Sequence, residues 1–175
     1  MLWYTVSVVT CMRILFEDES VIVCIKERGL LSQTDSGGGE SMVSLLSAHC
    51  NNQVYPLHRL DREVGGVMVY AKTKKAAANL SRDIAEHKFI KEYIALIHGK
   101  PESDSGEMRD LLFKDSRKNK SFVVKRQRKG VKEALLEYSL LETDGDFSTV
   151  LIRLHTGRTH QIRVHMKSIG HPLFA

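Results

Sequence analysis

Cysteine is scarce in this chain of 175 residues. Only Cys11, Cys24 and Cys50 occur, an odd number with wide spacing and no CxxC pair. A disulfide framework needs paired cysteines, and a zinc ribbon needs closely spaced ones. The spacing fits neither class, and reduced thiols in an intracellular protein are the simplest interpretation.

Long apolar segments are also lacking. The most apolar stretch, from Leu2 to Met12, is too short to span a bilayer. It has neither the basic flank nor the clear cleavage site of a signal peptide. We therefore expect no membrane association. We also expect residues 1–11 to be a non-native or disordered extension, with one folded domain over residues 12–175.

The motifs of nucleotide cofactor sites and serine hydrolases do not occur. The run Gly37-Gly38-Gly39 is not followed by the Lys and Ser or Thr of a phosphate-binding loop, and the chain has no GxSxG. Residues His155, His160 and His165 lie five apart, which turns successive side chains to different faces of a helix or strand. We therefore expect no cofactor and no metal in the reaction.

Composition indicates a soluble globular domain, since 42% of the residues are hydrophobic and 27% are charged. The formal net charge is +5, and the positive charge is concentrated. Between Arg109 and Lys132 there are ten Lys or Arg residues and two acidic residues, Asp110 and Asp115. This segment is either a solvated hairpin face or a surface that binds the phosphates of a nucleic acid.

Hydrophobic periodicity predicts an α+β fold with a central mixed or largely antiparallel sheet flanked by helices and loops. Ser41 is a candidate N-cap for one helix and Thr73 for another. A hairpin is expected around the turn Asp144-Gly145-Asp146. The expected strands cover residues 14–16, 21–25, 67–71, 89–98, 134–141 and 147–154, and the expected helices cover residues 42–50, 73–86 and 159–168.

Two segments combine charged and imidazole side chains with apolar neighbours, residues 57–62 and residues 155–165. In the first segment, Asp61 lies between Arg59 and Arg62. A carboxylate close to Arg stays ionised in a partly buried site, and it is then a plausible nucleophile. A structural Arg–Asp pair is the alternative interpretation of Asp61 from these residues alone.

Three motifs, taken in order, resemble those of a known family. The first is His58-Arg59-Leu60-Asp61, the second runs from Lys91 (KEYIA) to Gly99, and the third is TGRTHQIRVH at residues 156–165, followed by GHP at residues 170–172. Together they resemble the RluA-like family of RNA pseudouridine synthases. The resemblance implies the catalytic fold of that family over residues 12–175 and isomerisation of a uridine in ribosomal or transfer RNA.

The resemblance also implies a role for each matching residue. Asp61 would be the nucleophile, which lets the uracil detach, rotate and rejoin through carbon 5. Tyr93 would lie against the flipped uracil and help to remove the carbon-5 proton. Arg163, or alternatively Arg158, would pair with Asp61, and Arg59 would enter the space that the flipped base leaves. An aromatic face for stacking and an Arg beside a carboxylate suit this chemistry.

RNA is the expected partner of a cytoplasmic monomer. The residues expected to bind it come from the motifs and from the basic segment: Arg59, Arg158, His160, Gln161, Arg117, Lys118, Lys120, Lys125, Arg126 and Arg128.

The sequence departs from the family pattern at four points. Residues 25–29 read IKERG, without the usual proline, and Val64-Gly65-Gly66 replaces the usual Thr-Ser-Gly after the first motif. The chain stops shortly after the third motif, which predicts a truncated C-terminus, and no S4-like RNA-binding domain is expected. An RNA-binding protein of the same fold without turnover is the second hypothesis. A metal-dependent hydrolase using the histidines is the third.

Overall fold

The computed structural model describes residues 12–35, 37–118 and 120–174. The expected extension, residues 1–11, therefore lies outside the described residues. Two compact units divide the chain, the first ending at Glu86 and the second beginning at His87. Each unit has its own sheet, and each is described by itself.

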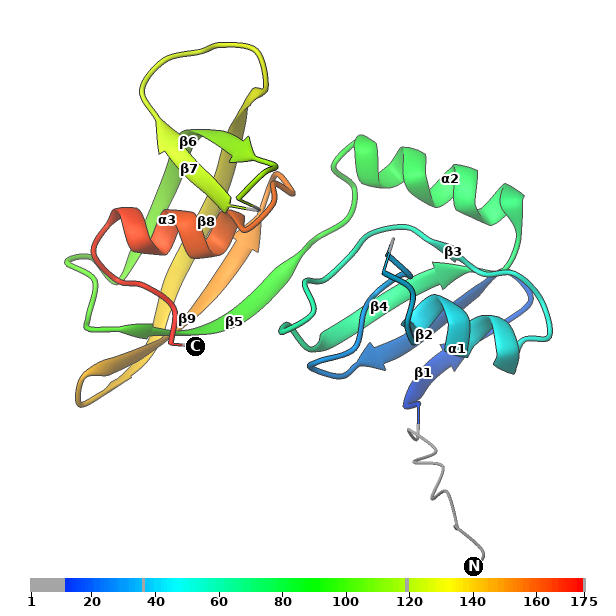
Figure 1. Ribbon diagram of the computed structural model, residues 1–175. Coiled ribbons are helices and arrows are strands. Elements are labelled where there is room, and N and C mark those ends of the chain that lie inside the picture. Colours follow the sequence, from blue (N-terminus) through cyan, green and yellow to red (C-terminus); the bar gives the residue numbers. More distant parts are fainter. Residues whose placement is uncertain (1–11, 36, 119, 175) are drawn as a thin grey trace, which may run out of the picture. The chain divides into compact units, whose positions relative to one another are not determined.

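The first unit contains a four-stranded antiparallel sheet in the order β1-β2-β4-β3. Helices α1 and α2 flank this sheet (Figure 1). The strands and helices are β1 (Ile14–Glu17), β2 (Val21–Lys26), α1 (Met42–His49), β3 (Tyr55–Pro56), β4 (Gly66–Ala71) and α2 (Lys74–Ala85).

Period-two alternation places every second residue of β2 in the interior, namely Ile22, Cys24 and Lys26, all fully buried. On the paired strand β4, Met68 and Tyr70 are also fully buried. The buried strand residues are therefore apolar, with one exception. Lys26 is a charged side chain inside the unit, and it needs polar partners there.

Local signals set the helix starts of this unit as predicted. The Ser41 hydroxyl accepts a hydrogen bond from the Ser44 amide at 3.2 Å, and Thr73 accepts one from the Ala76 amide at 3.1 Å. The Ser44 hydroxyl in turn accepts from the Ser41 amide, which completes a capping box. Each cap satisfies an amide that the first helical turn leaves without a partner.

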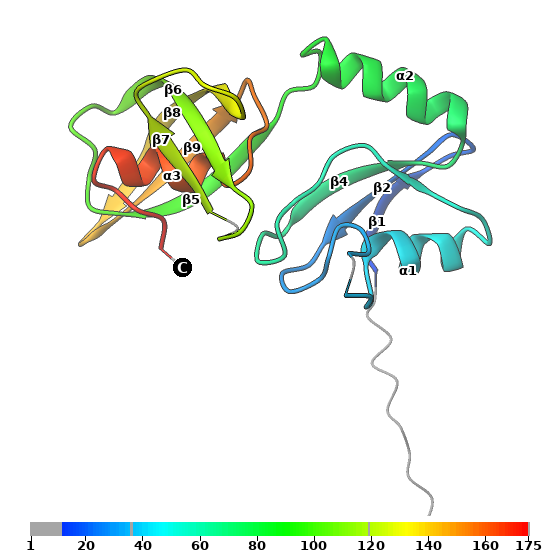
Figure 2. The ribbon, with the colours of Figure 1, turned by 45° about the horizontal axis from the view of Figure 1, so that its top comes forward.

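The second unit contains a five-stranded antiparallel sheet in the order β5-β9-β8-β6-β7. Helix α3 lies across one face of this sheet (Figure 2). The strands are β5 (Glu92–His98), β6 (Ser105–Asp115), β7 (Lys120–Val124), β8 (Val131–Asp144) and β9 (Phe147–Leu154), and α3 covers Gln161–Ser168.

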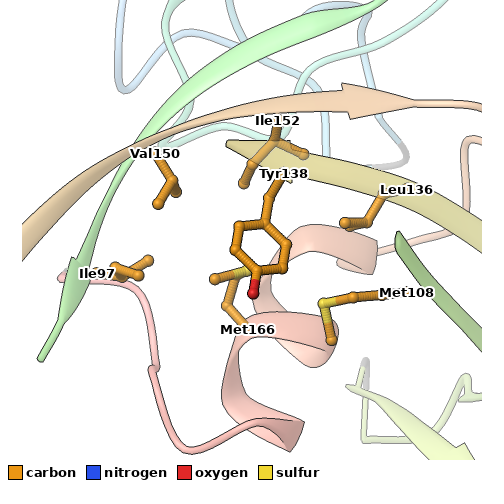
Figure 3. Packing of buried hydrophobic residues seen from close by; sticks show 7 residues of the cluster. All are labelled: Ile97, Met108, Leu136, Tyr138, Val150, Ile152 and Met166. Carbon is orange, nitrogen blue, oxygen red and sulfur yellow. The ribbon is translucent and has the colours of Figure 1, made fainter. Parts of the chain in front are cut away.

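The core of the second unit lies between α3 and the sheet (Figure 3). Met166 of α3 is fully buried among strand residues. Four strands contribute alternate residues to this face, because residues two apart on a strand point to the same side. The cluster consists of Ile97, Met108, Leu136, Tyr138, Val150, Ile152 and Met166.

The predicted α+β class with largely antiparallel strand pairing is confirmed. The described strands form two separate sheets, and all their pairs are antiparallel. Strand pairing depends on contacts between residues far apart in sequence, and hydrophobic periodicity does not encode these contacts. The basic segment forms most of β6 and β7 and the loop after them, and β5 begins at Glu92, three residues later than expected.

His165 on α3 is a fully buried histidine, and neither ring nitrogen has a hydrogen-bond partner. The carboxylate oxygen Oδ2 of Asp110 lies 3.8 Å from Nε2 of His165. Burial lowers the pKa of His165, because a charged imidazolium is poorly solvated there, and the attraction of Asp110 opposes this only in part. The folded protein therefore holds His165 neutral.

A pH-dependent stability follows from this burial. Below pH of about 6.5 the unfolded chain gains a proton on His165 that the folded chain resists, so the free energy of unfolding falls as the pH falls. We expect His165→Leu to flatten this fall between pH 7.5 and 5.5 in urea unfolding. His87→Asn, at an exposed histidine with a φ of 58° that Asn tolerates, is the matched control and should keep the wild-type slope. An unchanged slope in His165→Leu would contradict the assignment.

Candidate active site

Asp61 lies in the loop between β3 and β4. It is half-buried, whereas its neighbour Leu60 is buried and Arg59 is exposed. The apolar side chain of Leu60 thus anchors the loop, while Asp61 and Arg59 remain accessible. His58 belongs to the same motif, and its Nε2 atom accepts a hydrogen bond from the Val69 amide of β4 at 3.4 Å.

Hydrogen bonds hold the backbone on both sides of Asp61. The buried Ser32 hydroxyl donates to the Leu60 carbonyl at 2.8 Å and accepts from the Leu60 amide at 3.0 Å. On the other side, the Gly29 amide donates to the Arg62 carbonyl at 2.8 Å, and Nε of Arg62 donates to the Gly29 carbonyl at 2.8 Å. The segment after β2 therefore fixes the residues before and after Asp61.

The ammonium group of Lys26 completes this clamp. Its Nζ donates to the carbonyls of Glu27 at 2.9 Å, Leu30 at 2.7 Å and Arg62 at 3.1 Å. Burial lowers the pKa of Lys26, and the negative charges of Glu63, Asp61 and Glu27 oppose that shift. Lys26 thus ties the Asp61 loop to the end of β2 and adds a positive charge that attracts Asp61.

Sequence reasoning missed Lys26, although a signal existed. The alternation of β2 continues Ile22 and Cys24 into Lys26, which places the lysine at an inward position. A charged residue at an inward position of a strand predicts a buried and fully partnered group.

The altered turn after Asp61 suits this close packing. A side chain at Gly65 would bring its Cβ within 3.3 Å of the Lys26 carbonyl oxygen. Gly66 has a φ of 150°, which favours glycine. The two glycines let the loop return into β4 directly beside the backbone of Lys26.

The second unit carries the other predicted catalytic residues. Tyr93 on β5 is half-buried, pairs with Ile152 of β9 and packs against the core cluster on the face that α3 covers. Ile162 of α3 packs against the same cluster, and the next residue, Arg163, is exposed. Asp61 and Arg163 belong to different units, and their pairing stays a prediction.

Gln161 organises the loop that leads into α3. It is 2% exposed, and its Oε1 accepts from the Arg158 amide at 3.0 Å and from the Thr156 hydroxyl at 2.8 Å. Its Nε2 donates to the Leu135 carbonyl at 3.0 Å. This buried amide supports the loop from inside, so the structure gives Gln161 a structural position, and its expected contact with RNA stays a prediction.

Arg158 and His160 lie in the loop that Gln161 supports. Nε of Arg158 donates to the Glu133 carbonyl at 2.8 Å. The positive charge of Arg158 lies near the half-buried Lys91, and it lowers the Lys91 pKa together with the larger effect of burial. His160 has a φ of 56° and precedes α3, which begins at Gln161 and not at Thr159 as expected.

The basic segment forms a hairpin with exposed cations. Arg117 and Lys118 follow β6, where both their amides donate to Oδ1 of Asp115. The guanidinium of Arg128, in the loop before β8, lies 4.8 Å from the ring centre of Phe113. The six predicted phosphate-binding residues are all exposed on this hairpin and the loop after it: Arg117, Lys118, Lys120, Lys125, Arg126 and Arg128.

His155 and His165, which lie at the two ends of residues 155–165, have separate environments. Nε2 of His155 lies 2.9 Å from a carboxylate oxygen of Glu137, whereas His165 is buried near Asp110.

Within the part of the chain that the structure describes, no helix is long and apolar enough to cross a membrane.

Comparison with known proteins identifies the family. The RNA pseudouridylate synthase family matches residues 20–168. The chain therefore belongs to this family, and the resemblance to its RluA-like members is confirmed.

Individual relatives agree with that membership. The chain is similar to "Ribosomal large subunit pseudouridine synthase D" of Borreliella burgdorferi, with 33% identity over 91% of this chain and 52% of the relative. It is also similar to "tRNA pseudouridine(32) synthase, mitochondrial" of Saccharomyces cerevisiae, with 32% identity over 92% and 35% of the two chains. The solved structure of "Human RNA Pseudouridylate Synthase Domain Containing 1" has a TM-score of 0.79 and 25% identity, covering 93% of this chain and 66% of that one.

The chain spans about half the length of several of its curated bacterial relatives, from 52% to 55%. Family and fold are therefore established for the segment itself. The activity and substrate of the whole protein belong to the proposal below.

Replacement of Lys26 tests the clamp. Lys26→Met keeps the buried aliphatic chain but removes the ammonium donor from three carbonyls, of which that of Arg62 keeps the Gly29 amide as a donor. We expect it to lower the free energy of unfolding by roughly 1–3 kcal/mol or more. We also expect a lower rate constant for the chemical step at unchanged RNA affinity, because the Asp61 loop loosens while the basic hairpin is intact. Urea unfolding and single-turnover kinetics measure the two effects.

Lys75→Met, at an exposed lysine in the first turn of α2, is the matched control. It should change the free energy of unfolding by less than about 0.5 kcal/mol. An equally small effect of Lys26→Met would refute the clamp.

Proposed function

We propose that this chain carries the catalytic machinery of an RNA uridine isomerase, with Asp61 as the nucleophile. The observation that carries the proposal is the clamped loop around Asp61. Its backbone is fixed on both sides by Ser32, Gly29 and Lys26. A half-buried carboxylate held in this way is positioned before its substrate arrives, which favours nucleophilic attack.

The proposed reaction rearranges one nucleotide. A uridine inside an RNA helix must leave the base stack so that the enzyme can reach its reacting bonds. The bond from the sugar to nitrogen 1 breaks, a bond from the sugar to carbon 5 forms, carbon 5 loses a proton and nitrogen 1 gains one. No electrons are exchanged in this balance, so the reaction itself requires no redox cofactor.

The other proposed roles come from the second unit. Tyr93 offers an aromatic surface for the flipped uracil and a phenol to help move the carbon-5 proton. Arg163, or alternatively Arg158, pairs with Asp61 and keeps it ionised and oriented. Arg59 enters the gap that the base leaves, which its exposure permits.

The proposed substrate is ribosomal or transfer RNA, because the relatives include a ribosomal large subunit synthase and a tRNA synthase. The cations of the hairpin support this class of partner, since clustered Lys and Arg bind phosphates without reading sequence. We further propose that the protein works as a cytoplasmic monomer.

RNA binding without turnover is the second candidate function. The hairpin cations lie on strands and loops that do not include Asp61, so they can bind phosphates whatever Asp61 does. Whether Asp61 variants still form pseudouridine distinguishes the two candidate functions.

Pseudouridine mapping tests the proposal in cells. Carbodiimide labelling and primer extension on total RNA would compare the wild-type gene, a deletion and Asp61→Ala. We expect one site to disappear on deletion and to return only with the wild-type gene, because Ala provides no nucleophile. A map that is unchanged by the deletion, or restored by Asp61→Ala, would contradict the enzyme and favour RNA binding.

Replacement of Arg163 tests the orientation of Asp61. We expect Arg163→Ala to slow single turnover at saturating RNA by roughly a hundredfold or more, about 2.7 kcal/mol of transition-state stabilisation. Lys118→Ala, at an exposed hairpin cation, should weaken RNA binding and reduce its salt dependence while sparing the rate at saturation. Equal single-turnover rates for wild type and Arg163→Ala would rule out the proposed role.

A further inference from the structure

A second cluster of reactive side chains lies in the first unit, at the opposite end of the sheet from Asp61. It joins Glu17 at the end of β1, His49 at the end of α1, and Cys50 directly after it. In the pairing of β2 with β4, Val21 lies opposite Ala71 at this end, and Lys26 lies opposite Gly66 at the Asp61 end. The two ends are about 17 Å apart, since a strand rises about 3.3 Å per residue.

The three side chains converge on one point. Nε2 of His49 lies 2.9 Å from Oε2 of Glu17, and Sγ of Cys50 lies 3.9 Å from Oε1 of the same carboxylate. Each residue offers one ligand atom, and these atoms all lie within 4.8 Å of one another. Glu17 and His49 are exposed and Cys50 is half-buried, so an ion in solution can reach the cluster.

We propose that Glu17, His49 and Cys50 form a binding site for a zinc-like divalent metal ion. Imidazole, thiolate and carboxylate are the three ligand types that zinc uses, at about 2.0–2.3 Å from the metal. In a tetrahedral site these bond lengths place ligand atoms about 3.3–3.8 Å apart. Small side-chain adjustments bring the observed separations to these values, and water completes the coordination.

Lys72 shapes the cluster and is compatible with the metal. Its Nζ donates to Oε1 of Glu17 at 2.6 Å, and this interaction, followed by that of His49, lowers the pKa of Glu17. Lys72 thus holds Oε1, whereas Oε2 faces Nε2 of His49 at 2.9 Å, so a bound metal ion would replace the hydrogen bond between these two ligand atoms. Ligating carboxylates commonly have such an outer partner, which orients them.

Cys50 supplies the sulfur ligand of the site, and zinc binds cysteine as the thiolate, so metal binding displaces the thiol proton. The bound ion would join β1 to the end of α1 and stabilise the first unit.

Cobalt titration of the purified chain tests the site, with Co²⁺ as a spectroscopic substitute for Zn²⁺. The Cys11→Ser variant removes a thiol outside the described residues and provides the background. Cys24 needs no replacement, because it is fully buried and out of reach of the added ion. We expect one equivalent of Co²⁺ with a thiolate charge-transfer band, displacement by Zn²⁺, and a rise in the melting temperature on addition of Zn²⁺.

Two variants in the Cys11→Ser background separate a site from adventitious binding. Cys50→Ser should abolish the charge-transfer band, and His49→Gln should weaken Co²⁺ binding at least tenfold, with both proteins folded by circular dichroism. An absent band in the background protein, or full Co²⁺ affinity in either variant, would overturn the proposal. Because the cluster is remote from Asp61, Cys50→Ser without metal should retain the isomerase rate, so the outcome is independent of the proposed function.

Discussion

The buried ammonium of Lys26 is the interaction on which the geometry of the Asp61 loop depends. A charge without water in a protein interior is costly unless polar atoms replace its hydration. Here three backbone carbonyls supply those atoms, and one of them belongs to Arg62, directly after Asp61. The requirement to solvate one charge thereby fixes two loops to each other. Ser32 and the two glycines, Gly65 and Gly66, are needed because the loops lie so close together.

In the second unit, a buried side chain also fixes a loop, but this side chain is neutral. Gln161 is buried beneath the loop before α3, and its amide satisfies the Arg158 backbone, the Thr156 hydroxyl and the Leu135 carbonyl. Each unit thus carries a buried polar side chain that organises a loop of a family motif. Partly satisfied buried groups are expensive, so both loops are held in a narrow range of conformations. That rigidity is what a reaction at a single nucleotide requires.

Local features could be predicted from the sequence, because nearby residues determine them. The caps at Ser41 and Thr73 and the turn at Gly145 are of this kind. The three motifs also predicted the family. The number of sheets could not be predicted, because pairing between distant strands decides it. The burial of Gln161 was missed for a related reason, because one of its partners, Leu135, is 26 residues away.

The release of tritium from carbon 5 of uridine tests whether this chain isomerises uridine and needs Asp61 to do so. Purified protein would be mixed with unmodified ribosomal and transfer RNA transcripts carrying tritium at that carbon. Isomerisation replaces the carbon–hydrogen bond by a bond to the sugar, so the label passes into water. We predict release from one RNA by the wild-type chain, with the unlabelled transcript unchanged in mass and no release by Asp61→Ala. RNA that binds the wild-type chain yet releases no more tritium than with Asp61→Ala would contradict this prediction.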